Sequence, residues 1–209
     1  MTPSESMQNV DTRGKEEFDR YEVLGYGHRI LSPMVFEDFS FLEHFDWAQG
    51  ELHERLGDVE HNPGEAWKLW PELWTKYLDE SGHFDYTYRQ QIWSWRQIEC
   101  VVLELEARPN SRRAVISIWD DKRGSARQHR KQRVPCSMYY QFFLRDGNLD
   151  MIYNMRSCDL ITHYPYDVAL ACGLRDDVIR RLEGAVKPGW FQHHAGSLHA
   201  YRKDLEGVF

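Results

Sequence analysis

The sequence has few cysteines, no long apolar run and no recognisable signal segment, and each absence excludes a class of protein. No run approaches the ~20 apolar residues of a membrane helix, so we expect a soluble protein. Because no apolar segment precedes the first charged residues, we expect a reducing compartment without disulfides: the cytoplasm, or the host cytoplasm if the chain is phage-encoded. The cysteines match no metal-ligand spacing; they are Cys100, Cys136, Cys158 and Cys172.

A surplus of positive charge is also absent. Acidic residues number 33 against 26 Lys and Arg, which gives a formal charge of −7. Binding to a phosphate backbone depends on surplus Lys and Arg, so a nucleic-acid polymer is not expected as the main partner. A small anion held by a local arginine cluster remains compatible with this composition.

The length and the hydrophobic content predict one domain. With 209 residues and 42% hydrophobic residues, the chain can form one proper core but hardly two. The first 20 residues are mostly polar and lack periodicity, which predicts a mobile tail, and residues 21–209 form the predicted domain. Eight tryptophans are many for this size, and we interpret most of them as packing residues.

The N-terminal half alternates between strand and helix signals. Residues 21–31 read as a strand, and residues 36–49 carry apolar residues at helical spacing, so Glu43 is predicted to lie inside a helix. The charged, Gly-punctuated residues 50–63 predict a surface excursion. A short amphipathic helix is predicted where tryptophans recur at spacings of three and four, at Trp67, Trp70 and Trp74.

The C-terminal half predicts a sheet with helices around it. A helix is expected over residues 90–105 and a β-rich run over 114–119. Two strands, 137–144 and 149–154, are joined at Arg145-Asp-Gly-Asn, a strong hairpin signal. Next come a helix over 167–182, a break at Lys187-Pro-Gly, and a last strand through His199 and Tyr201. This order predicts an α+β fold with a mixed, largely sequential sheet layered with helices.

Cys136 is the candidate nucleophile. It follows Pro135 at the head of a predicted strand. A lone cysteine is most often buried and inert. A thiolate, however, can add to carbon 6 of a pyrimidine and so make carbon 5 nucleophilic, which requires a thiol with a lowered pKa. Arg156 is our candidate for the positive charge that would lower it.

Arginines and hydroxyl groups predict a nucleotide site around this cysteine. Arginine forks bind phosphate through charge-assisted hydrogen bonds. Arg156, Ser157 and the pair Arg112-Arg113 meet that need, although an arginine pair alone is usually a solvated turn.

Two residues near the end of the chain are candidates for holding a sugar. His199 and Tyr201 lie two apart, so on a strand they face the same side and could bind one sugar hydroxyl. The histidines match no standard metal spacing, and no metal is expected.

Four ordered groups of residues resemble the thymidylate synthase family over most of the chain, from about residue 21. They are Ser111-Arg-Arg with Ser117-Ile-Trp119, Pro135-Cys136 with Tyr140-Gln-Phe, Arg156-Ser-Cys-Asp159 with Pro165-Tyr-Asp167, and His199-Ala-Tyr201. The resemblance implies a homodimer formed through the sheet, a pyrimidine nucleoside monophosphate as substrate, and 5,10-methylenetetrahydrofolate as the one-carbon donor.

The resemblance also implies a role for each matching residue. Cys136 is the nucleophile, Arg156 and Ser157 bind phosphate together with Arg112 and Arg113 from the other subunit, and His199 and Tyr201 bind the sugar. Tyr88 assists proton removal at carbon 5, Trp74 packs beside the folate, and Asp159 contacts it. Glu43 matches the general acid/base glutamate, although Glu51 and Glu54 are nearby in sequence. Arg13 is a weak match to an N-terminal phosphate-binding arginine.

Asp167 departs from the pattern, since thymidylate synthases have there an asparagine that reads uracil. A carboxylate accepts a hydrogen bond from the amino group of cytosine and repels the O4 carbonyl of uracil. Deoxycytidylate hydroxymethylases of this fold carry that aspartate. A mismatch at such a contact is worth ~2 kcal/mol or more, which is enough to reverse base preference.

A second departure is the short sequence after Tyr201, where thymidylate synthases continue with a segment that closes over folate. An open site favours water as the species that captures the one-carbon unit. We therefore expect a hydroxymethylase acting on dCMP or CMP. A dUMP-acting synthase or hydroxymethylase, with Asp167 protonated, is the alternative. A non-catalytic nucleotide-binding relic is a further one, against which the retention of Cys136, Glu43 and Tyr88 speaks.

Overall fold

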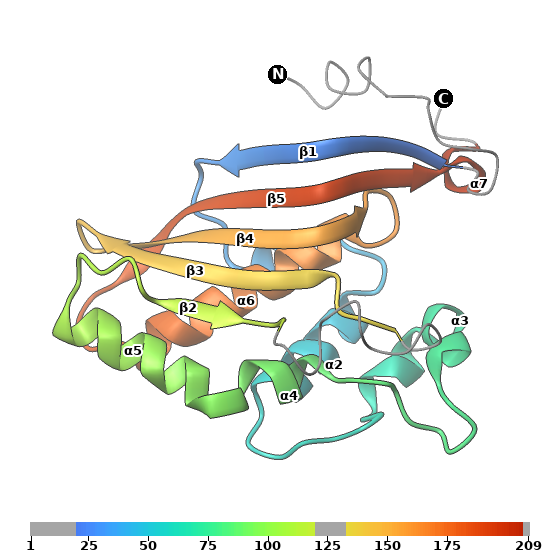
Figure 1. Cartoon of the computed structure of the whole chain (residues 1–209), viewed down its shortest axis with the longest axis horizontal. Helices are drawn as coiled ribbons and strands as arrows, with labels where there is room; N and C mark the ends of the chain where they lie inside the picture. The colour runs from blue at the N-terminus through green and yellow to red at the C-terminus, as the bar shows by residue number, and fades with distance from the viewer. Residues whose placement is uncertain (1–19, 120–132, 207–209) are drawn as a thin grey trace.

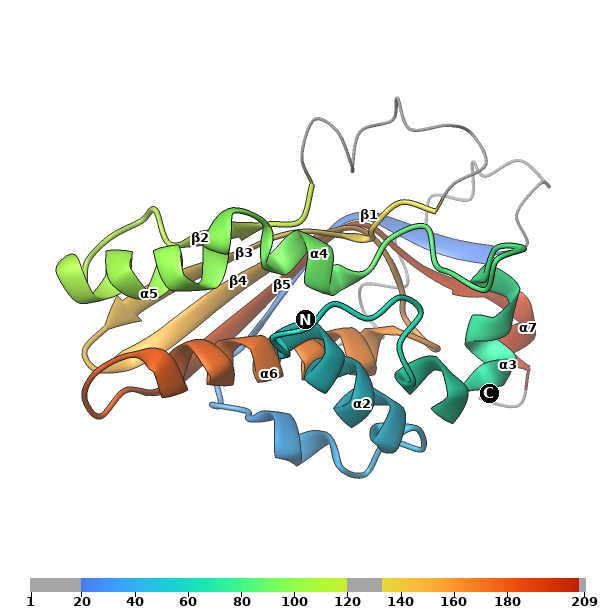
Figure 2. The same ribbon diagram turned by 90° about the horizontal axis from the view of Figure 1, so that it is seen from below.

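A five-stranded mixed sheet organises the molecule, and helices lie against one of its faces (Figures 1 and 2). The computed structural model describes residues 20–119 and 133–206. The strand order is β1-β5-β4-β3-β2. The strands are β1 (Arg20–Ile30), β2 (Val115–Ser117), β3 (Ser137–Arg145), β4 (Asn148–Asp159) and β5 (Lys187–Tyr201).

The longest helix, α6 (Tyr164–Arg181), joins the two parallel strands of the sheet. β4 and β5 run parallel, whereas β2 with β3, β3 with β4, and β1 with β5 are antiparallel. The other helices are α2 (Phe45–Leu56), α3 (Pro71–Trp74), α4 (Tyr88–Ile92), α5 (Gln97–Ala107) and α7 (Arg202–Leu205). The described ranges also contain four 3₁₀ turns: η2 (Phe36–Phe39), η3 (Ala66–Leu69), η4 (Thr75–Tyr77) and η5 (Ser94–Arg96).

The predicted hairpin between β3 and β4 is confirmed. Arg145 pairs with Asn148, and the two residues between them have positive φ angles, 49° at Asp146 and 73° at Gly147. Two left-handed residues in a two-residue turn match the right-handed twist of the flanking strands. The turn therefore sets the register of the strand pair that carries the nucleotide-side residues.

The core lies between the sheet and α6. Inward-facing side chains of β3 and β4, such as Phe142 and Met151, are fully buried. Each contributes about 1.5–3 kcal/mol through burial of apolar surface. Small residues on α6 let α2 approach closely, since a Cβ at Gly173 would lie 2.5 Å from the side chain of Leu52. This contact holds α2 against the middle of α6.

The predicted helix over residues 36–49 is wrong. Only η2 and, after a turn, the first residues of α2 are helical there, and α2 continues to Leu56 through the predicted surface excursion. Glu43 lies in the turn before α2 and is exposed. The apolar periodicity fails in the second half of α2 because its inward face carries Glu51 and Arg55, which pair with each other.

The predicted helix over residues 90–105 is interrupted. α4 ends at Ile92, and Trp95 and Arg96 have φ angles of 57° and 54°. These left-handed residues break the hydrogen-bond ladder before α5 begins. The tryptophan-rich segment likewise forms η3 and α3, with Pro71 at the start of α3, rather than one helix.

Three boundaries also differ from the predictions. β1 begins at Arg20, the last residue of the predicted tail; α6 begins three residues earlier than predicted; and Lys187 starts β5 instead of breaking the chain before it. Within the ranges 20–119 and 133–206, no helix has the length and apolarity that crossing a bilayer requires.

Candidate active site

The topology gathers the nucleotide-side residues at one end of the parallel strand pair. Cys136 immediately precedes β3, and its carbonyl accepts a hydrogen bond from the backbone of Arg156 on β4 (2.8 Å). The parallel register places Ser157 opposite Ser197 and Asp159 opposite His199. Because α6 begins shortly after β4 ends, its first turn brings the side chain of a further residue, Asp167, to the same end, as the contact with Cys158 described below shows.

Arg156 is fixed against the backbone beside the thiol of Cys136. Its Nε donates to the carbonyl of Pro135 (3.0 Å), its Nη2 to that of Val134 (3.1 Å), and Nη2 lies 3.7 Å from the Cys136 sulfur. Burial raises the pKa of Cys136, and the charge of Arg156 offsets this only in part. The expected lowering of the thiol pKa is therefore wrong for the ligand-free protein, because desolvation disfavours the thiolate more than one cation stabilises it.

Asp167 is partly buried, and the thiol of Cys158 contacts one of its oxygens (Sγ to Oδ2, 3.8 Å). Burial raises the pKa of Asp167 to about 7, while the nearby charge of Arg55 acts in the opposite direction. Near neutral pH the carboxyl group is thus present both with and without its proton.

His199 and Tyr201 face the same side of β5, as their spacing predicts. Their rings meet edge to face at 5.3 Å, and Nδ1 of His199 lies 3.5 Å from the hydroxyl oxygen of Ser157. Burial lowers the pKa of His199, so the imidazole is neutral at physiological pH. Asp159 accepts hydrogen bonds from the backbone of Ile161 and Thr162 (3.1 Å each), which fixes the turn that leads into α6.

Tyr88 reaches the head of β3 from α4. The hydroxyl of Thr87 accepts a hydrogen bond from the backbone of Gln90 (3.3 Å) and begins the helix at Tyr88. The phenol oxygen of Tyr88 accepts hydrogen bonds from the hydroxyl (3.1 Å) and the backbone N–H (3.4 Å) of Ser137. Burial raises the pKa of Tyr88 well above its ordinary value, so the phenol keeps its proton.

An ion pair on α2, between the buried Arg55 and the half-buried Glu51, lies beside Tyr88. Arg55 donates through Nε to Glu51 (2.7 Å), and its guanidinium lies 4.0 Å from the centre of the Tyr88 ring. Glu51 and Glu54 both line the site, whereas Glu43 is exposed in the turn before α2. Glu54 accepts hydrogen bonds from the backbone of Glu65 and Ala66, which gives it a structural role. Glu51 is therefore the carboxylate that the fold offers, and its spacing of four from Arg55 is the sequence signal that could have identified it.

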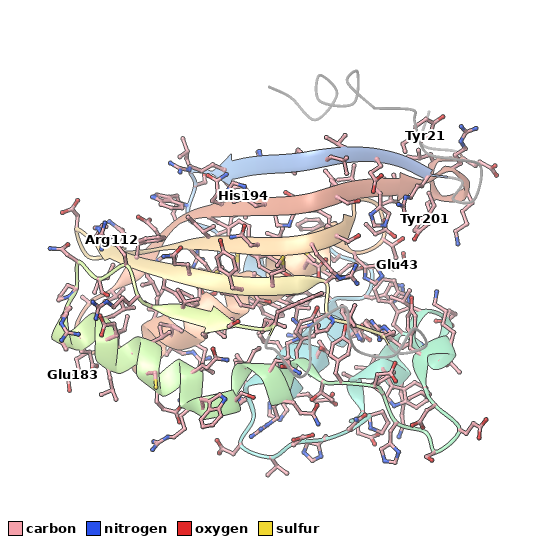
Figure 3. The ribbon with its side chains drawn as sticks, viewed as in Figure 1. Tyr21, Glu43, Arg112, Glu183, His194 and Tyr201 are labelled. Carbon is pink, nitrogen blue, oxygen red and sulfur yellow. The ribbon has the colours of Figure 1, made fainter. Side chains whose placement is uncertain are left out.

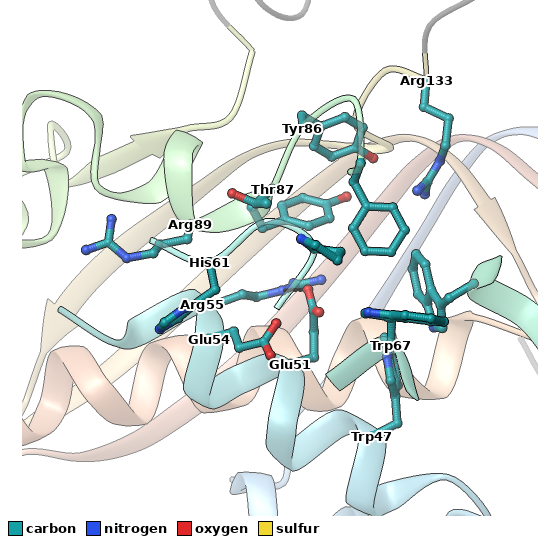
Figure 4. Close-up of a pocket in the computed structure, with 14 residues that line it drawn as sticks. Trp47, Glu51, Glu54, Arg55, His61, Trp67, Tyr86, Thr87, Arg89 and Arg133 are labelled. Atoms are coloured by element: carbon teal, nitrogen blue, oxygen red, sulfur yellow. Dashed lines mark hydrogen bonds and ion pairs between the residues drawn. The ribbon is translucent and has the colours of Figure 1, made fainter. Parts of the chain in front are cut away.

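Glu51, Arg55 and Tyr88 line a cleft between α2 and the segment that leads into α4 (Figure 4). Its aromatic walls include Trp74, which stacks on Trp47 with ring centres 5.3 Å apart. The indole N–H groups of Trp67 and Trp74 are buried and have no acceptor among the described residues. Aromatic walls with unused donors suit a flat heterocycle rich in acceptors. The lining residues are Trp47, Glu51, Glu54, Arg55, His61, Pro63, Trp67, Trp74, Phe84, Tyr86, Thr87, Tyr88, Arg89 and Arg133.

Two predicted groups are not part of this arrangement. Arg112 and Arg113 are exposed before β2, and Figure 3 places Arg112 at the opposite end of the sheet from Tyr201. Arg13 lies outside the described residues. In the described part of the chain, no group of three or more His, Cys, Asp or Glu side chains is arranged to hold a metal ion.

The fold is that of the thymidylate synthases. The structure of a thermostable thymidylate synthase A from Bacillus subtilis superimposes with a TM-score of 0.70 at 16% sequence identity, over 90% of this chain and 69% of the other. The family model for thymidylate synthase matches residues 60–209. The chain belongs to the thymidylate synthase family, whose members are one-carbon transferases that use methylenetetrahydrofolate. The predicted fold class is confirmed.

Proposed function

We propose that the protein is a cytidylate 5-hydroxymethyltransferase that acts on dCMP or CMP. The observation that carries this proposal is Asp167, a carboxyl group in the first turn of α6 where the family has an amide. Burial is the main cause that raises the pKa of the Cys136 thiol, and the charge of Asp167 acts in the same direction, which supports a site that both groups share. A base contacted by Asp167 would therefore lie within the electrostatic range of the nucleophile.

Asp167 suits the Watson–Crick edge of cytosine. The amino group of cytosine is a donor that a carboxylate accepts, whereas O4 of uracil presents an acceptor to it. Because burial raises the pKa of Asp167 to about 7, part of the molecules also carry a proton there. That proton can be donated to N3, the acceptor of cytosine.

The remaining nucleotide contacts follow from the neighbouring side chains. Cys136 adds to carbon 6 of the base, and Arg156 favours the thiolate form. Arg156 and Ser157 bind the phosphate, and His199 and Tyr201 bind the sugar. Arg112, the neighbour of Arg113 in the chain, lies at the opposite end of the sheet from Tyr201 (Figure 3). We therefore propose that a homodimer forms through the sheet and that each subunit supplies this arginine pair to its partner's phosphate site.

The cleft suits the folate. 5,10-Methylenetetrahydrofolate, when bound, supplies the carbon that is attached to carbon 5. Trp74 and the other aromatic walls would hold its ring system, and the unused indole N–H groups of Trp67 and Trp74 would meet its acceptor atoms. Asp159 would contact it from the end of β4.

Removal of the carbon 5 proton falls to Glu51 and Tyr88, with Glu51 in place of Glu43. Both line the cleft. A neutral phenol can orient a water molecule, and the Glu51 carboxylate can take the proton which that water removes from carbon 5. After the bond from the new one-carbon group to tetrahydrofolate has broken, a water molecule guided by the same carboxylate adds to that group. Cys136 then leaves carbon 6, which gives the hydroxymethyl product.

The Asp167→Asn variant tests the reading of the base. Tritium release from carbon 5 of dCMP, CMP and dUMP with methylenetetrahydrofolate, followed by mass spectrometry, gives substrate and product together. We expect the wild type to add CH₂O to a cytidine nucleotide and the variant to shift toward dUMP by about 30-fold, the equivalent of ~2 kcal/mol. An unchanged preference would contradict the role of Asp167.

A dUMP-acting synthase or hydroxymethylase is the second candidate, since a protonated Asp167 can donate to O4 of uracil. The pKa of about 7 is the observation that favours it. Turnover of dUMP alone by the wild type would establish this candidate. Absence of tritium release from all three nucleotides would instead indicate a nucleotide-binding relic.

A further inference from the structure

Ser137, the neighbour of Cys136 in the chain, joins three tyrosine hydroxyls below the candidate site. Its hydroxyl oxygen lies 2.6 Å from that of Tyr153, 3.1 Å from that of Tyr88 and 3.4 Å from that of Tyr140. Ser137 is fully buried, as are Tyr140 and Tyr153, whose rings stack with centres 4.5 Å apart. Among the described residues, these contacts link Tyr88 to the interior of the sheet.

The number of protons decides the direction of these hydrogen bonds. A serine hydroxyl donates one hydrogen bond and accepts two. Tyr140 donates to Ser137, and if Tyr153 also donates, both lone pairs of the serine oxygen are occupied. Burial raises the pKa of both tyrosines, so each retains a proton to donate. The single proton of Ser137 then goes to Tyr88.

Tyr88 consequently receives two hydrogen bonds from Ser137, one from the hydroxyl and one from the backbone N–H. A phenol oxygen has two lone pairs, and both are now occupied. The proton of Tyr88 itself must point away from Ser137. Tyr88 is therefore a hydrogen-bond donor, and not an acceptor, toward the neighbouring Tyr86 and toward the cleft that both residues line.

We propose that Ser137 is a positioning residue that fixes the proton of Tyr88 toward the water molecule which acts at carbon 5. The proposal rests on the function proposed above. The water accepts the Tyr88 proton in a hydrogen bond through one lone pair and donates one of its own to Glu51. Its second lone pair then faces carbon 5. When that lone pair takes the carbon 5 proton, the water passes a proton to the Glu51 carboxylate, and charge and atoms balance.

The ring of Tyr88 does not depend on Ser137 for its place. The guanidinium of Arg55 lies 4.0 Å from the ring centre, and the capped first turn of α4 fixes the backbone. Removing the serine hydroxyl should thus change the direction of the Tyr88 proton more than the position of the ring. The effect of Ser137 on the Tyr88 proton can therefore be tested separately from its effect on protein stability.

Three variants form the experiment: Ser137→Ala, Tyr153→Phe, and the double variant. Tritium release from [5-³H]dCMP with methylenetetrahydrofolate, the Kd of dCMP and unfolding by urea are measured for each.

Ser137→Ala leaves buried hydroxyls without a partner and should lower stability, whereas removing both partners in the double variant should restore much of it. We expect tritium release to fall about tenfold to hundredfold in both variants that lack Ser137, with the Kd of dCMP unchanged. Tyr153→Phe keeps the serine proton on Tyr88 and should keep most of the activity.

Continued loss of tritium release in the stabilised double variant would support the positioning role. Recovery of activity together with stability would overturn it, because Ser137 would then act only on the fold. Full activity of Ser137→Ala would overturn it as well. A wild type that releases no tritium from any pyrimidine nucleotide would instead overturn the proposed function, and this proposal with it.

Discussion

The guanidinium of Arg156 lies 3.7 Å from the sulfur of Cys136 and is held there by the carbonyls of Pro135 and Val134. The backbone that carries the nucleophile thus also fixes the charge beside it. Even so, burial keeps the pKa of Cys136 above its ordinary value of 9.0. In the ligand-free protein the nucleophile rests as a thiol.

Alkylation of Cys136 should therefore require alkaline pH. We expect its rate with iodoacetamide to rise through a midpoint above 9.0. Arg156→Met should move that midpoint higher, because the thiolate loses its stabilising charge, and Arg156→Lys should move it less. Peptide mass mapping distinguishes the four cysteines: exposed Cys100 is the reactive reference, and buried Cys158 and Cys172 are the unreactive ones. A midpoint below 9.0 in the ligand-free wild type would contradict the effect of burial.

Glu51 and Glu43 offer a matched pair of variants. Glu51→Gln should lower carbon 5 tritium release about 10²–10⁴-fold, since Glu51 is the carboxylate of the cleft. Glu43→Gln changes an exposed turn and should stay within roughly twofold of the wild type. Urea unfolding of both variants controls for loss of the pair with Arg55. A larger loss of tritium release in Glu43→Gln than in Glu51→Gln would show that Glu43 is the general acid/base.

Stability should depend on pH through Asp167. Its folded-state pKa is about 7, above the ordinary 3.8, so the folded protein keeps a proton that the unfolded chain has lost between these values. The stability due to this proton is complete below about pH 4 and is lost as the pH rises to about 7, by up to ~1.4 kcal/mol per pH unit. The Asp167→Asn variant has no carboxyl group at this position, so its stability does not fall in this way as the pH rises. The free energy of unfolding of the variant minus that of the wild type should accordingly increase between about pH 5 and about pH 7 and stay constant above that. Parallel urea curves at all pH values would argue against the raised pKa.

Subunit mixing tests the dimer. The Cys136→Ser variant and the Arg112→Gln/Arg113→Gln double variant should each be inactive alone. If each phosphate site uses Arg112 and Arg113 of the partner subunit, unfolding the two together and refolding them should restore about a quarter of wild-type activity, because half the dimers are mixed and each has one complete site. No recovery, with mixed dimers shown to form by native mass spectrometry, would place the arginine pair in the same subunit's site or outside it.

The sequence alone predicted the parts of the fold that depend on local signals. The Asp146-Gly147 turn, the strand alternation that puts His199 and Tyr201 on one face, and the helix between the last two strands all follow local patterns. The same segments carry Cys136, Arg156 and Asp167. The nucleotide side of the candidate site was therefore predictable as a set.

The other side of the site depends on long-range packing. Glu51 and Arg55 place charged groups on the inward face of α2. Hydrophobic periodicity assigns charged positions to the solvent-exposed face, so it predicts the wrong orientation here. Gly50, in the same helix, packs so closely on η3 that an added Cβ would lie 3.1 Å from that of Ala66. The left-handed Trp95 and Arg96 also carry no glycine signal. The pKa of Cys136 was misjudged for a related reason, because the sequence shows the neighbouring charge but not the desolvation.

Among the described residues, β1 pairs with β5 alone at the edge of the sheet, and this has a consequence for biosynthesis. Arg20 pairs with Tyr201, so β1 must wait until β5 has been synthesised before it finds this neighbour. Such distant pairings slow folding. Until then the nascent chain exposes an unpaired strand, a template for association with other chains. Ribosome-associated chaperones would thus meet the nascent chain while β1 is still unpaired.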